Sequence, residues 1–456
     1  DINGPTTLFS SLPQRKQGVA GRVSYSYDGR YYIEGNFGYN GSENFAKGHR
    51  FGFFPSIAVG YNISNEKFWQ PIKPVISNLK IRGSWGLVGN DATNAGRFAY
   101  MEDLVLGGSD SYTTGIRQDT YYSGPSWNRY FNPDLTWEVG EKINLGLDLQ
   151  LFNDFNLTFD IFMTRENSIP EIVGTGETKI TSNNGEMENK GLDLAIDYNK
   201  QITKDFFLSF KSTLTFARNK VLKMDEPPYF EYPGLSDVGH PLGTYWGYVA
   251  DGLFPDQETI DNSPRQDLGY TPQPGDIKYV NQPNAKGEYD NVINSNDRVA
   301  IGHPYDTELV YGFGPSMKWK NWDFSFFFQG VARTSFMMYG MHPFGTTSIK
   351  NMLQFVADDH WSVDNPNPNA AYPRLTKDSN GNNDQYSTYW LRNAAFLKLK
   401  NAEIGYTYKG MRFYLSGVNL LTFSPFKHWD PEMGGGNGLY YPTQRVFNIG
   451  FQMTIQ

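Results

Sequence analysis

Alternation of apolar and polar residues between Trp137 and Met163 restricts the fold more than any other feature of the sequence. From Trp137 to Leu151 every odd-numbered residue except Glu141 is apolar, and every even-numbered residue is polar, charged or glycine. The alternation resumes at Phe155, after a short Asn-Asp turn, and its apolar row continues to Met163. Successive side chains of a β-strand point to opposite faces, so this pattern predicts a hairpin with one apolar and one polar face.

The same alternation returns in several other parts of the chain. It is clear over residues 192–198, 206–216, 322–328 and 447–455. Counting every such segment gives about 14 strands, with helices as minor elements. The predicted fold class is therefore all-β and antiparallel.

The balance of aromatic and polar residues indicates where such a sheet lies. Aromatic residues make up 16% of the 456 residues, yet the mean hydropathy is −0.54. A transmembrane β-barrel combines these properties, because lipid-facing and lumen-facing residues alternate and aromatic residues gather at both membrane interfaces. Long polar segments near 88–132, 220–243, 251–306 and 334–388 contrast with short turns such as 28–30. Outer-membrane barrels have long outer loops and short inner turns, so we expect a multi-pass barrel over residues 1–456.

Other function classes find little support. The chain has no cysteine, a net charge of −8 and no cluster of basic residues, so nucleic acid is not an expected partner. The six histidines show no pair with metal-site spacing on one strand face. Asp430 and Glu432 form a carboxylate pair, but no nucleophile–histidine–acid order or phosphate-binding loop accompanies them. An enzyme is therefore not predicted. A soluble or surface-attached carbohydrate-binding β-protein without transport activity remains the alternative.

Many short stretches of the sequence, in a fixed order, form a series that covers most of the chain. They are RYYIEGNFGYNGSENFAKGHRFGFFPSIAVGYNISNEKF from Arg30, LKIRGSWGLVGND from Leu79, GTYWGYVADGLF from Gly243, PGDIKYV from Pro274, DRVAIGHP from Asp297, DFSFFFQG from Asp323, DHWSVDNPNPNAAYPRL from Asp359, YWLRNAAFLKLKNAEIGY from Tyr389, VNLLTF from Val418 and WDPE from Trp429. In their number and order these stretches resemble the SusC/RagA-type TonB-dependent outer-membrane transporters, and the resemblance covers nearly the whole chain.

The resemblance implies a 22-stranded barrel, of which this chain is the C-terminal portion. The first strands, the plug domain and the segment that contacts TonB would precede Asp1, since the chain begins without a signal peptide and reads as starting in mid-protein. Family members work with a SusD-like surface lipoprotein that closes over the barrel as a lid, and they usually assemble as dimers of transporter–lid units. They import oligosaccharides, glycan fragments or peptides across the outer membrane, with energy delivered through TonB.

Two positions depart from the family pattern. Many members end on an aromatic residue that the assembly machinery reads, whereas this chain has Ile455 followed by Gln456. Many also carry an Asp- and Gly-rich, calcium-type loop after PGDIKYV. In the corresponding 274–300 loop the acidic spacing is diluted, and the remaining candidate Ca²⁺ ligands are Asp290, Asn294, Asn296 and Asp297. The residue pattern favours a network of turns for them over a bound ion.

Candidate site residues fall into two further groups. Aromatic and acidic residues in the long loops could contact a sugar or peptide, although loop packing or contact with the lid is the favoured role. These are Tyr121, Tyr122, Trp127, Tyr130, Asp359 and Trp361. Charged residues on the polar strand faces are expected to face the lumen and the plug, namely Glu138, Lys142, Asp148, Asp193, Asp197 and Lys211. The aromatic residues of the apolar rows, such as Trp137, Phe155, Phe159 and Phe324, are expected to face lipid or the membrane interface rather than to stack on a sugar.

Overall fold

The computed structural model describes residues 12–92, 97–107, 111–173, 180–339, 352–376 and 380–453. The chain divides into two compact units. Unit 1 contains residues 1–193 and 218–227, and unit 2 contains residues 194–217 and 228–456. No helix in the described part of the chain is long and apolar enough to cross a membrane.

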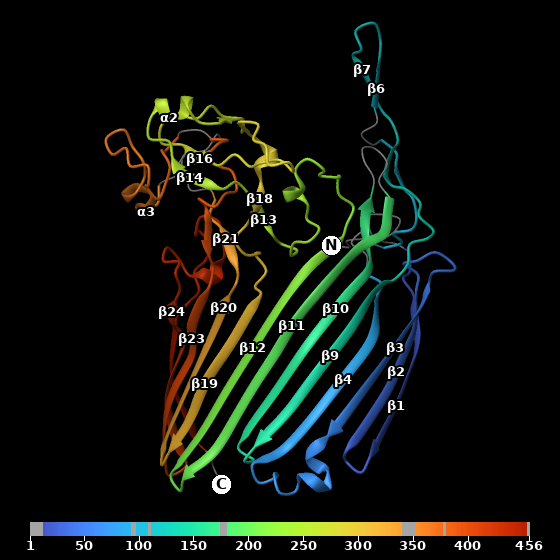
Figure 1. Ribbon diagram of the computed structural model, residues 1–456, viewed down its shortest axis with the longest axis vertical. Helices are drawn as coiled ribbons and strands as arrows, with labels where there is room; N and C mark the ends of the chain where they lie inside the picture. The colour runs from blue at the N-terminus through green and yellow to red at the C-terminus, as the bar shows by residue number, and fades with distance from the viewer. Residues whose placement is uncertain are drawn as a thin grey trace. The chain divides into compact units, whose positions relative to one another are not determined.

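The main sheet contains 13 strands in the described residues, and its strand order follows the chain order (Figure 1). Its strands are β1 (Lys16–Tyr27), β2 (Tyr31–Ser42), β3 (Phe51–Asn62), β4 (Ile76–Asn90), β9 (Glu138–Leu151), β10 (Phe155–Val173), β11 (Ile180–Thr203), β12 (Phe206–Lys223), β19 (Leu309–Trp319), β20 (Trp322–Ala332), β23 (Phe396–Tyr408), β24 (Met411–Phe423) and β25 (Val446–Met453). Strands that are consecutive in the sheet pair antiparallel, as in β9 with β10 and β23 with β24. The predicted all-β, antiparallel fold class is confirmed.

The hairpin predicted from the alternation is the β9–β10 pair of unit 1. Leu151 pairs with Phe155, and the register continues to Val139 opposite Asn167. The turn places Phe152 and Asn153 at positive φ, 53° and 62°. Such turns match the twist of the flanking strands, and asparagine tolerates this conformation well.

Trp137 corrects one sequence-based expectation. Its side chain is only 7% exposed and packs in a small core with Phe45 and Leu135, so it does not face lipid. Its ring centroid lies 5.3 Å from that of Phe54, and its indole N–H donates to the carbonyl of Arg50 at 3.0 Å. The alternation continues past the point where the strand enters the loop layer. The period of two residues therefore predicted a lipid-facing ring where the structure has a buried one.

Short elements connect the long strands of unit 1. They are η1 (Ile63–Asn65), η2 (Lys67–Trp69), β5 (Asp103–Val105), β6 (Ser111–Thr114), β7 (Thr120–Ser123) and β8 (Ser126–Arg129). β5 pairs with β8, and β6 pairs with β7 in a separate hairpin. The residues of β6 and β7 are exposed throughout.

Unit 2 carries a larger layer of loops with its own short elements. They are η3 (Pro233–Leu235), β13 (Tyr245–Gly247), β14 (Ala250–Leu253), α2 (Gln257–Asp261), β15 (Arg265–Gln266), β16 (Ile277–Tyr279), β17 (Val292–Ile293), η4 (Ser295–Asp297), β18 (Val299–Ile301), β21 (Ser335–Met337), α3 (Gln354–Asp358), β22 (Leu391–Asn393) and η5 (Pro431–Met433). β13 pairs with β18, β14 with β16, and β21 with β22. Helices are minor elements, as expected.

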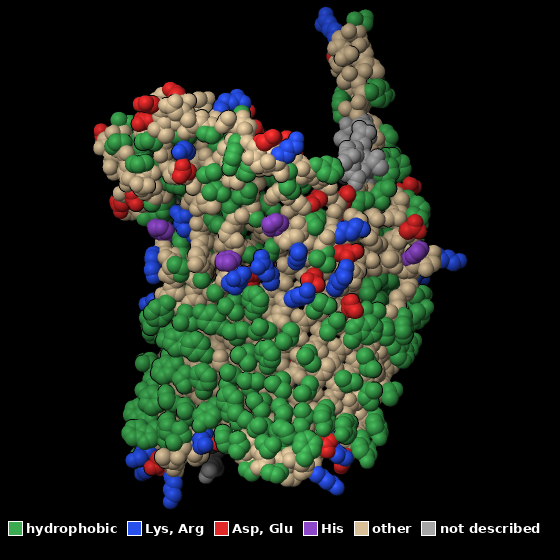
Figure 2. Space-filling view, viewed as in Figure 1, with side chains coloured by type: hydrophobic (Ala, Val, Ile, Leu, Met, Phe, Trp, Pro, Cys, Tyr) green, Lys and Arg blue, Asp and Glu red, His purple; other side chains and the backbone are tan. Residues whose placement is uncertain are grey.

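Apolar side chains of unit 2 fall into two populations. A buried core lies within the loop layer and includes Ile277, Tyr279, Met338 and Tyr372. The long strands instead expose their apolar rows, and in Figure 2 hydrophobic side chains gather over them. Ile449 on β25, for example, is 91% exposed. An exposed apolar surface of this extent on a sheet is typical of contact with lipid.

Candidate functional site

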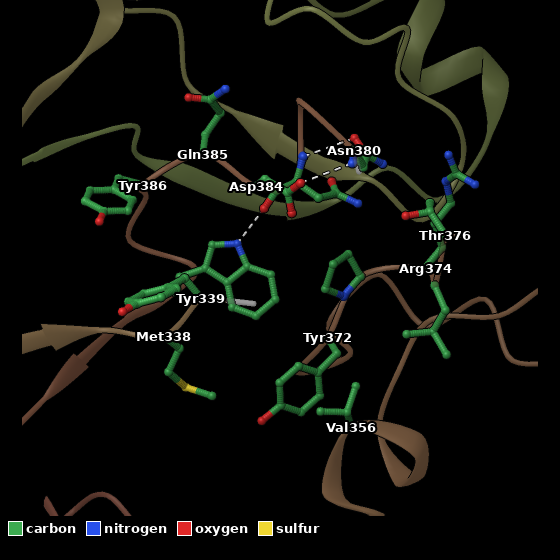
Figure 3. A pocket seen from close by; sticks show the side chains of 14 residues that line it. Met338, Tyr339, Val356, Tyr372, Arg374, Thr376, Asn380, Asp384, Gln385 and Tyr386 are labelled. Carbon is green, nitrogen blue, oxygen red and sulfur yellow. Dashed lines mark hydrogen bonds between the residues drawn. The ribbon is translucent and has the colours of Figure 1, made fainter. Parts of the chain in front are cut away.

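The loop layer of unit 2 encloses a cavity of about 190 Å³ (Figure 3). Its walls come from the end of β21, from α3 and from the segments 372–376 and 380–390. Tyr372 and Trp390 are buried, whereas Tyr339 and Tyr386 are 53% and 48% exposed and lie at the solvent side. The cavity therefore combines an aromatic interior with two accessible tyrosine rings.

A buried carboxylate holds one wall of this cavity in place. Asp276 has no exposed surface. One of its oxygens accepts hydrogen bonds from Arg374 Nε at 2.7 Å, from Asn380 Nδ2 at 3.0 Å and from Asn383 Nδ2 at 2.9 Å. Its other oxygen accepts from the backbone N–H of Gln273 at 2.8 Å. Arg374, Asn380 and Asn383 all line the cavity, so Asp276 positions three wall residues at once.

A second set of buried amides continues this network to β16. The Gln266 side chain accepts from the Tyr279 N–H at 2.7 Å and donates to the Ile277 carbonyl at 3.0 Å. Asn382 donates to the same carbonyl at 2.8 Å, and its own carbonyl accepts from the Tyr279 hydroxyl at 2.7 Å. Burial raises the pKa of Tyr279, so this hydroxyl stays protonated and remains a donor. Loop 380–384 is thus connected to β16 by hydrogen bonds between buried groups.

The chemistry that this cavity offers is binding. Its one arginine is already paired with Asp276 and also donates to the Tyr270 hydroxyl at 2.7 Å. The Trp390 indole N–H donates to the carbonyl of Asn383 at 2.7 Å. The walls present ring faces, apolar groups such as Val356, hydroxyl groups, and the polar side chains of Asn380, Asn383, Asp384 and Gln385.

The predicted loop aromatics of unit 1 lie on two different elements. Tyr121 and Tyr122 belong to the β6–β7 hairpin, where Tyr122 stacks on Tyr112 with ring centroids 5.1 Å apart. Trp127 on β8 stacks on Tyr130 at 5.4 Å. The structure brings Trp127 and Tyr130 together as a pair of rings, and contact of any of these residues with a ligand stays a prediction.

Asp359 and Trp361 lie in unit 2 and have different environments. Asp359 is exposed, and its carbonyl accepts from the Tyr372 N–H. Trp361 is 7% exposed and belongs to the loop core. Its ring covers Gly275, where an added Cβ would meet it at 2.2 Å. Trp361 therefore has the packing role that the sequence favoured for it, and a ligand contact for Asp359 stays a prediction.

The charged residues predicted for the lumen lie on strands of both units. Asp148 pairs with Arg82, which also binds Asp160 at 2.7 Å. Glu138 accepts from Asn90 at 3.3 Å. Lys211 and Asp197 form a 3.7 Å ion pair. Lys142 and Asp193 are exposed. All six alternate with the apolar rows, and their orientation toward a lumen stays a prediction.

The oxygen atoms of the candidate calcium loop serve as acceptors within its turns. Asp297 accepts from the backbone N–H groups of Gln282 and Asn294 at 2.7 and 2.8 Å. Asn294 accepts from Asn296 at 2.8 Å, and Asp290 accepts from Val292 at 3.0 Å. Burial raises the pKa of Asp297. In the described ranges no group of three or more histidine and acidic side chains is arranged to hold a metal ion. Calcium binding stays a prediction.

The sequence did not single out the residues that line the cavity. Tyr339, Tyr386 and Trp390 lie in the 334–388 segment or directly after it, which reads only as a long polar loop. The run Asn380–Gly381–Asn382–Asn383–Asp384 was the available signal, since amides and aspartates cluster where backbone groups need side-chain partners.

Long antiparallel strands with exposed apolar rows, topped by an ordered loop layer, define the class of outer-membrane β-barrel proteins. Within this class, residues 1–266 match the family model described as "TonB dependent receptor-like, beta-barrel", and the chain belongs to this family. Together with the relatives described next, this match places the chain in the outer membrane and confirms the resemblance to SusC/RagA-type transporters.

Individual relatives agree with this family. The TonB-dependent receptor SusC of Bacteroides thetaiotaomicron is 29% identical, over 95% of this chain and 43% of the relative. The TonB-dependent receptor P26 of Formosa agariphila is 28% identical, over 95% and 45%. The RagAB peptide transporter shares the fold, with a TM-score of 0.74 at 21% identity over 96% of this chain and 47% of that one. The chain spans about half the length of the relatives it matches.

Proposed function

We propose that this chain forms the C-terminal barrel portion of an importer that carries a nutrient, an oligosaccharide or a peptide, across the outer membrane. TonB supplies the energy through a plug-bearing segment of the full-length protein. A SusD-like lipoprotein covers the loop layer as a lid, and two transporter–lid units pair. Family membership and the relatives' own names as TonB-dependent receptors support this proposal.

The observation that carries the proposal is the ordered cavity in the loop layer of unit 2. Long loops of an outer-membrane barrel lie on the external side, where a substrate arrives. A wall of three residues held by one buried carboxylate is preorganised for binding, which lowers the entropy cost of capturing a ligand. An external binding site on a membrane-spanning sheet suits an importer. The exposed apolar rows of the long strands do not favour the alternative, a soluble carbohydrate-binding protein.

Uptake by whole cells tests this function. Cells that express the full-length protein, cells that lack it and cells that lack TonB would each receive a mixture of oligosaccharides and peptides, and the medium would be followed by mass spectrometry. We expect a defined set of compounds to disappear only when both proteins are present. Equal depletion by cells without the transporter would contradict the proposal. Co-purification of a lipoprotein from detergent-solubilised membranes tests the lid separately.

A further inference from the structure

The connection between β3 and β4 is much longer than the turns beside it. Residues 63–75 form this connection, which we call the interface segment, and it lies at the lower end of the strands in Figure 1. The N–H of Asn62 donates to the carbonyl of Arg30, in the β1–β2 turn, at 2.7 Å. The N–H of Phe152, in the β9–β10 turn, donates to the carbonyl of Val75 at 2.9 Å. The segment therefore lies among the short turns of unit 1, and short turns of an outer-membrane barrel face the periplasm.

The interface segment is folded through its own backbone. Beyond η1 and η2, the N–H groups of Ile72 and Lys73 both donate to the carbonyl of Trp69, at 2.9 and 3.0 Å. The N–H of Val75 donates to the carbonyl of Ile72 at 2.9 Å. The indole N–H of Trp69 donates to the carbonyl of Ile76 at 3.1 Å. Backbone groups that are paired within a segment lower the cost of placing that segment against lipid.

Glu66 fixes the interface segment to the lipid-facing side of the sheet. Tyr31 and Tyr61 are directly opposite each other on β2 and β3, with ring centroids 5.0 Å apart. They continue an exposed apolar row in which Ile33 is paired with Val59. Glu66 accepts from the hydroxyl groups of Tyr31 and Tyr61 at 2.7 and 3.2 Å. The segment is therefore joined to the lipid-facing side chains of these strands.

Large apolar side chains of the interface segment are exposed. Phe68, Ile72 and Val75 have 64%, 41% and 49% of their surface exposed. Phe152 of the adjacent turn is 56% exposed and is hydrogen-bonded to Val75 through its backbone. These side chains extend the apolar surface of the strands past the last paired residues. A surface of this kind next to lipid-facing rows is typical of an element that lies in the membrane interface.

The interface segment also carries positive charge that the protein does not neutralise. Its one acidic residue, Glu66, is 8% exposed and is paired with Arg30 at 2.7 Å. Arg30 is in turn paired with Asp28 at 2.8 Å. Lys67 is exposed and Lys73 is partly exposed, and in the described part of the chain neither has a salt-bridge partner. Two lysines are thus available to anions beside the apolar surface.

We propose that the interface segment binds acidic phospholipids of the periplasmic leaflet of the outer membrane. The acyl chains lie against Phe68, Ile72 and Phe152, and the headgroup phosphates pair with Lys67 and Lys73. Exposed aromatic and apolar side chains together with lysines are the composition of protein elements that lie in a lipid interface. Each lysine near an anionic membrane surface adds to the attraction. This lipid site is on the opposite end of the strands from the long loops, so it is independent of nutrient capture.

Lipid binding to the purified full-length transporter in detergent tests this proposal. Native mass spectrometry would give the affinities for dioleoylphosphatidylglycerol and for dioleoylphosphatidylcholine, which has the same acyl chains and no net charge. We expect tighter binding of phosphatidylglycerol. Lys67→Gln combined with Lys73→Gln should weaken that binding about 30-fold, since each lysine contributes roughly fivefold. Phe68→Ala should weaken both lipids. Lys47→Gln, which changes an exposed lysine in the loop after β2, is the matched control and should bind as the unaltered protein does.

Hydrogen exchange in lipid nanodiscs gives a second measurement. Amides of residues 63–75 should exchange more slowly in phosphatidylglycerol nanodiscs than in phosphatidylcholine nanodiscs, and the double lysine variant should lose this difference. An unchanged preference for phosphatidylglycerol in the double variant, or the same loss in Lys47→Gln, would overturn the proposal. Equal exchange of 63–75 in detergent and in both kinds of nanodisc would show that another part of the protein covers the segment, and it would overturn the proposal as well.

Discussion

Replacing Asp276 by alanine is the sharpest test of how the cavity is held. The change removes four hydrogen bonds at a site without exposed surface and leaves the Arg374 guanidinium, whose side chain is 18% exposed, without its carboxylate. Breaking a buried ion pair by removing one partner costs about 3–5 kcal/mol. The amides of Asn380 and Asn383 also lose their acceptor, which adds to this cost without simple additivity.

The loss should appear as local opening of the loop layer. At the tenfold change per about 1.4 kcal/mol, a loss of 3 kcal/mol predicts roughly 100-fold faster hydrogen exchange of protected amides around 275–279 and 380–384. Exchange measured by mass spectrometry on the detergent-solubilised protein would detect it, while the long strands should exchange as before. Asp276→Asn keeps an acceptor oxygen for the amides and should give an intermediate effect.

A matched aspartate in the same loop layer provides the control. Asp256 caps α2 by accepting from the Thr259 N–H at 2.8 Å. Asp256→Ala should therefore cost only about 1 kcal/mol and affect that short helix alone. If Asp276→Ala exchanges no faster than Asp256→Ala around 380–384, the network argument is wrong. A double variant with Arg374→Ala should lose less than the sum of the two single changes, because it removes the unpaired charge as well.

Three further predictions concern other ionic contacts and one close approach. Lys398→Met leaves Asp430 and Glu432 without their buried cation and should destabilise the segment after β24 by about 3 kcal/mol, measured as faster exchange of residues 424–436; unchanged exchange would contradict it. Burial raises the pKa of Asp430, but the hydrogen bonds from Lys398 and Thr443 lower this pKa by more than burial raises it. The net pKa therefore lies below the ordinary value of an aspartate. A carboxyl group whose pKa is depressed in the folded state stabilises that state at pH values above its unfolded pKa, and this stabilisation is lost on acidification. The same segment should therefore open below about pH 4 and stay closed at neutral pH. Gly146→Ala should lower the thermal unfolding temperature, because its Cβ would lie 2.6 Å from Arg82 Cζ, whereas Gly140→Ala on the same strand meets only ordinary contacts and should have little effect.

The long strands were predictable from the sequence because one local rule governs them. Period 2 together with a short turn is enough to set the register of a hairpin, and β9–β10 has the predicted turn and faces. The rule stops working where a strand enters the loop layer, because the surroundings of a side chain then depend on segments distant in sequence. Trp137 continues the alternation but packs against Phe45, which lies in the loop after β2.

The cavity was not predictable for the same reason. Its supporting carboxylate, Asp276, and its asparagine donors are separated by more than 100 residues, and no local periodicity connects them. Tyr339 and Tyr386 reach the same cavity from two different loops. A single sequence records that these loops are rich in amides and aromatic rings. It does not record which amide meets which carboxylate, because that depends on how the loops pack.

The packing of the loop layer leads to a prediction about how the cavity binds a ligand. Its core includes fully buried residues, such as Ile277, Ile293 and Met338, contributed by three separate loop segments. A site built on such a core exists before the ligand arrives, so binding should not require these loops to fold. Protected amides at 277–279 should therefore exchange slowly in the ligand-free transporter, and their exchange should slow little more when a substrate is bound. Fast exchange there without ligand, followed by strong protection on binding, would show that the cavity forms only around its substrate and would refute the argument from preorganisation.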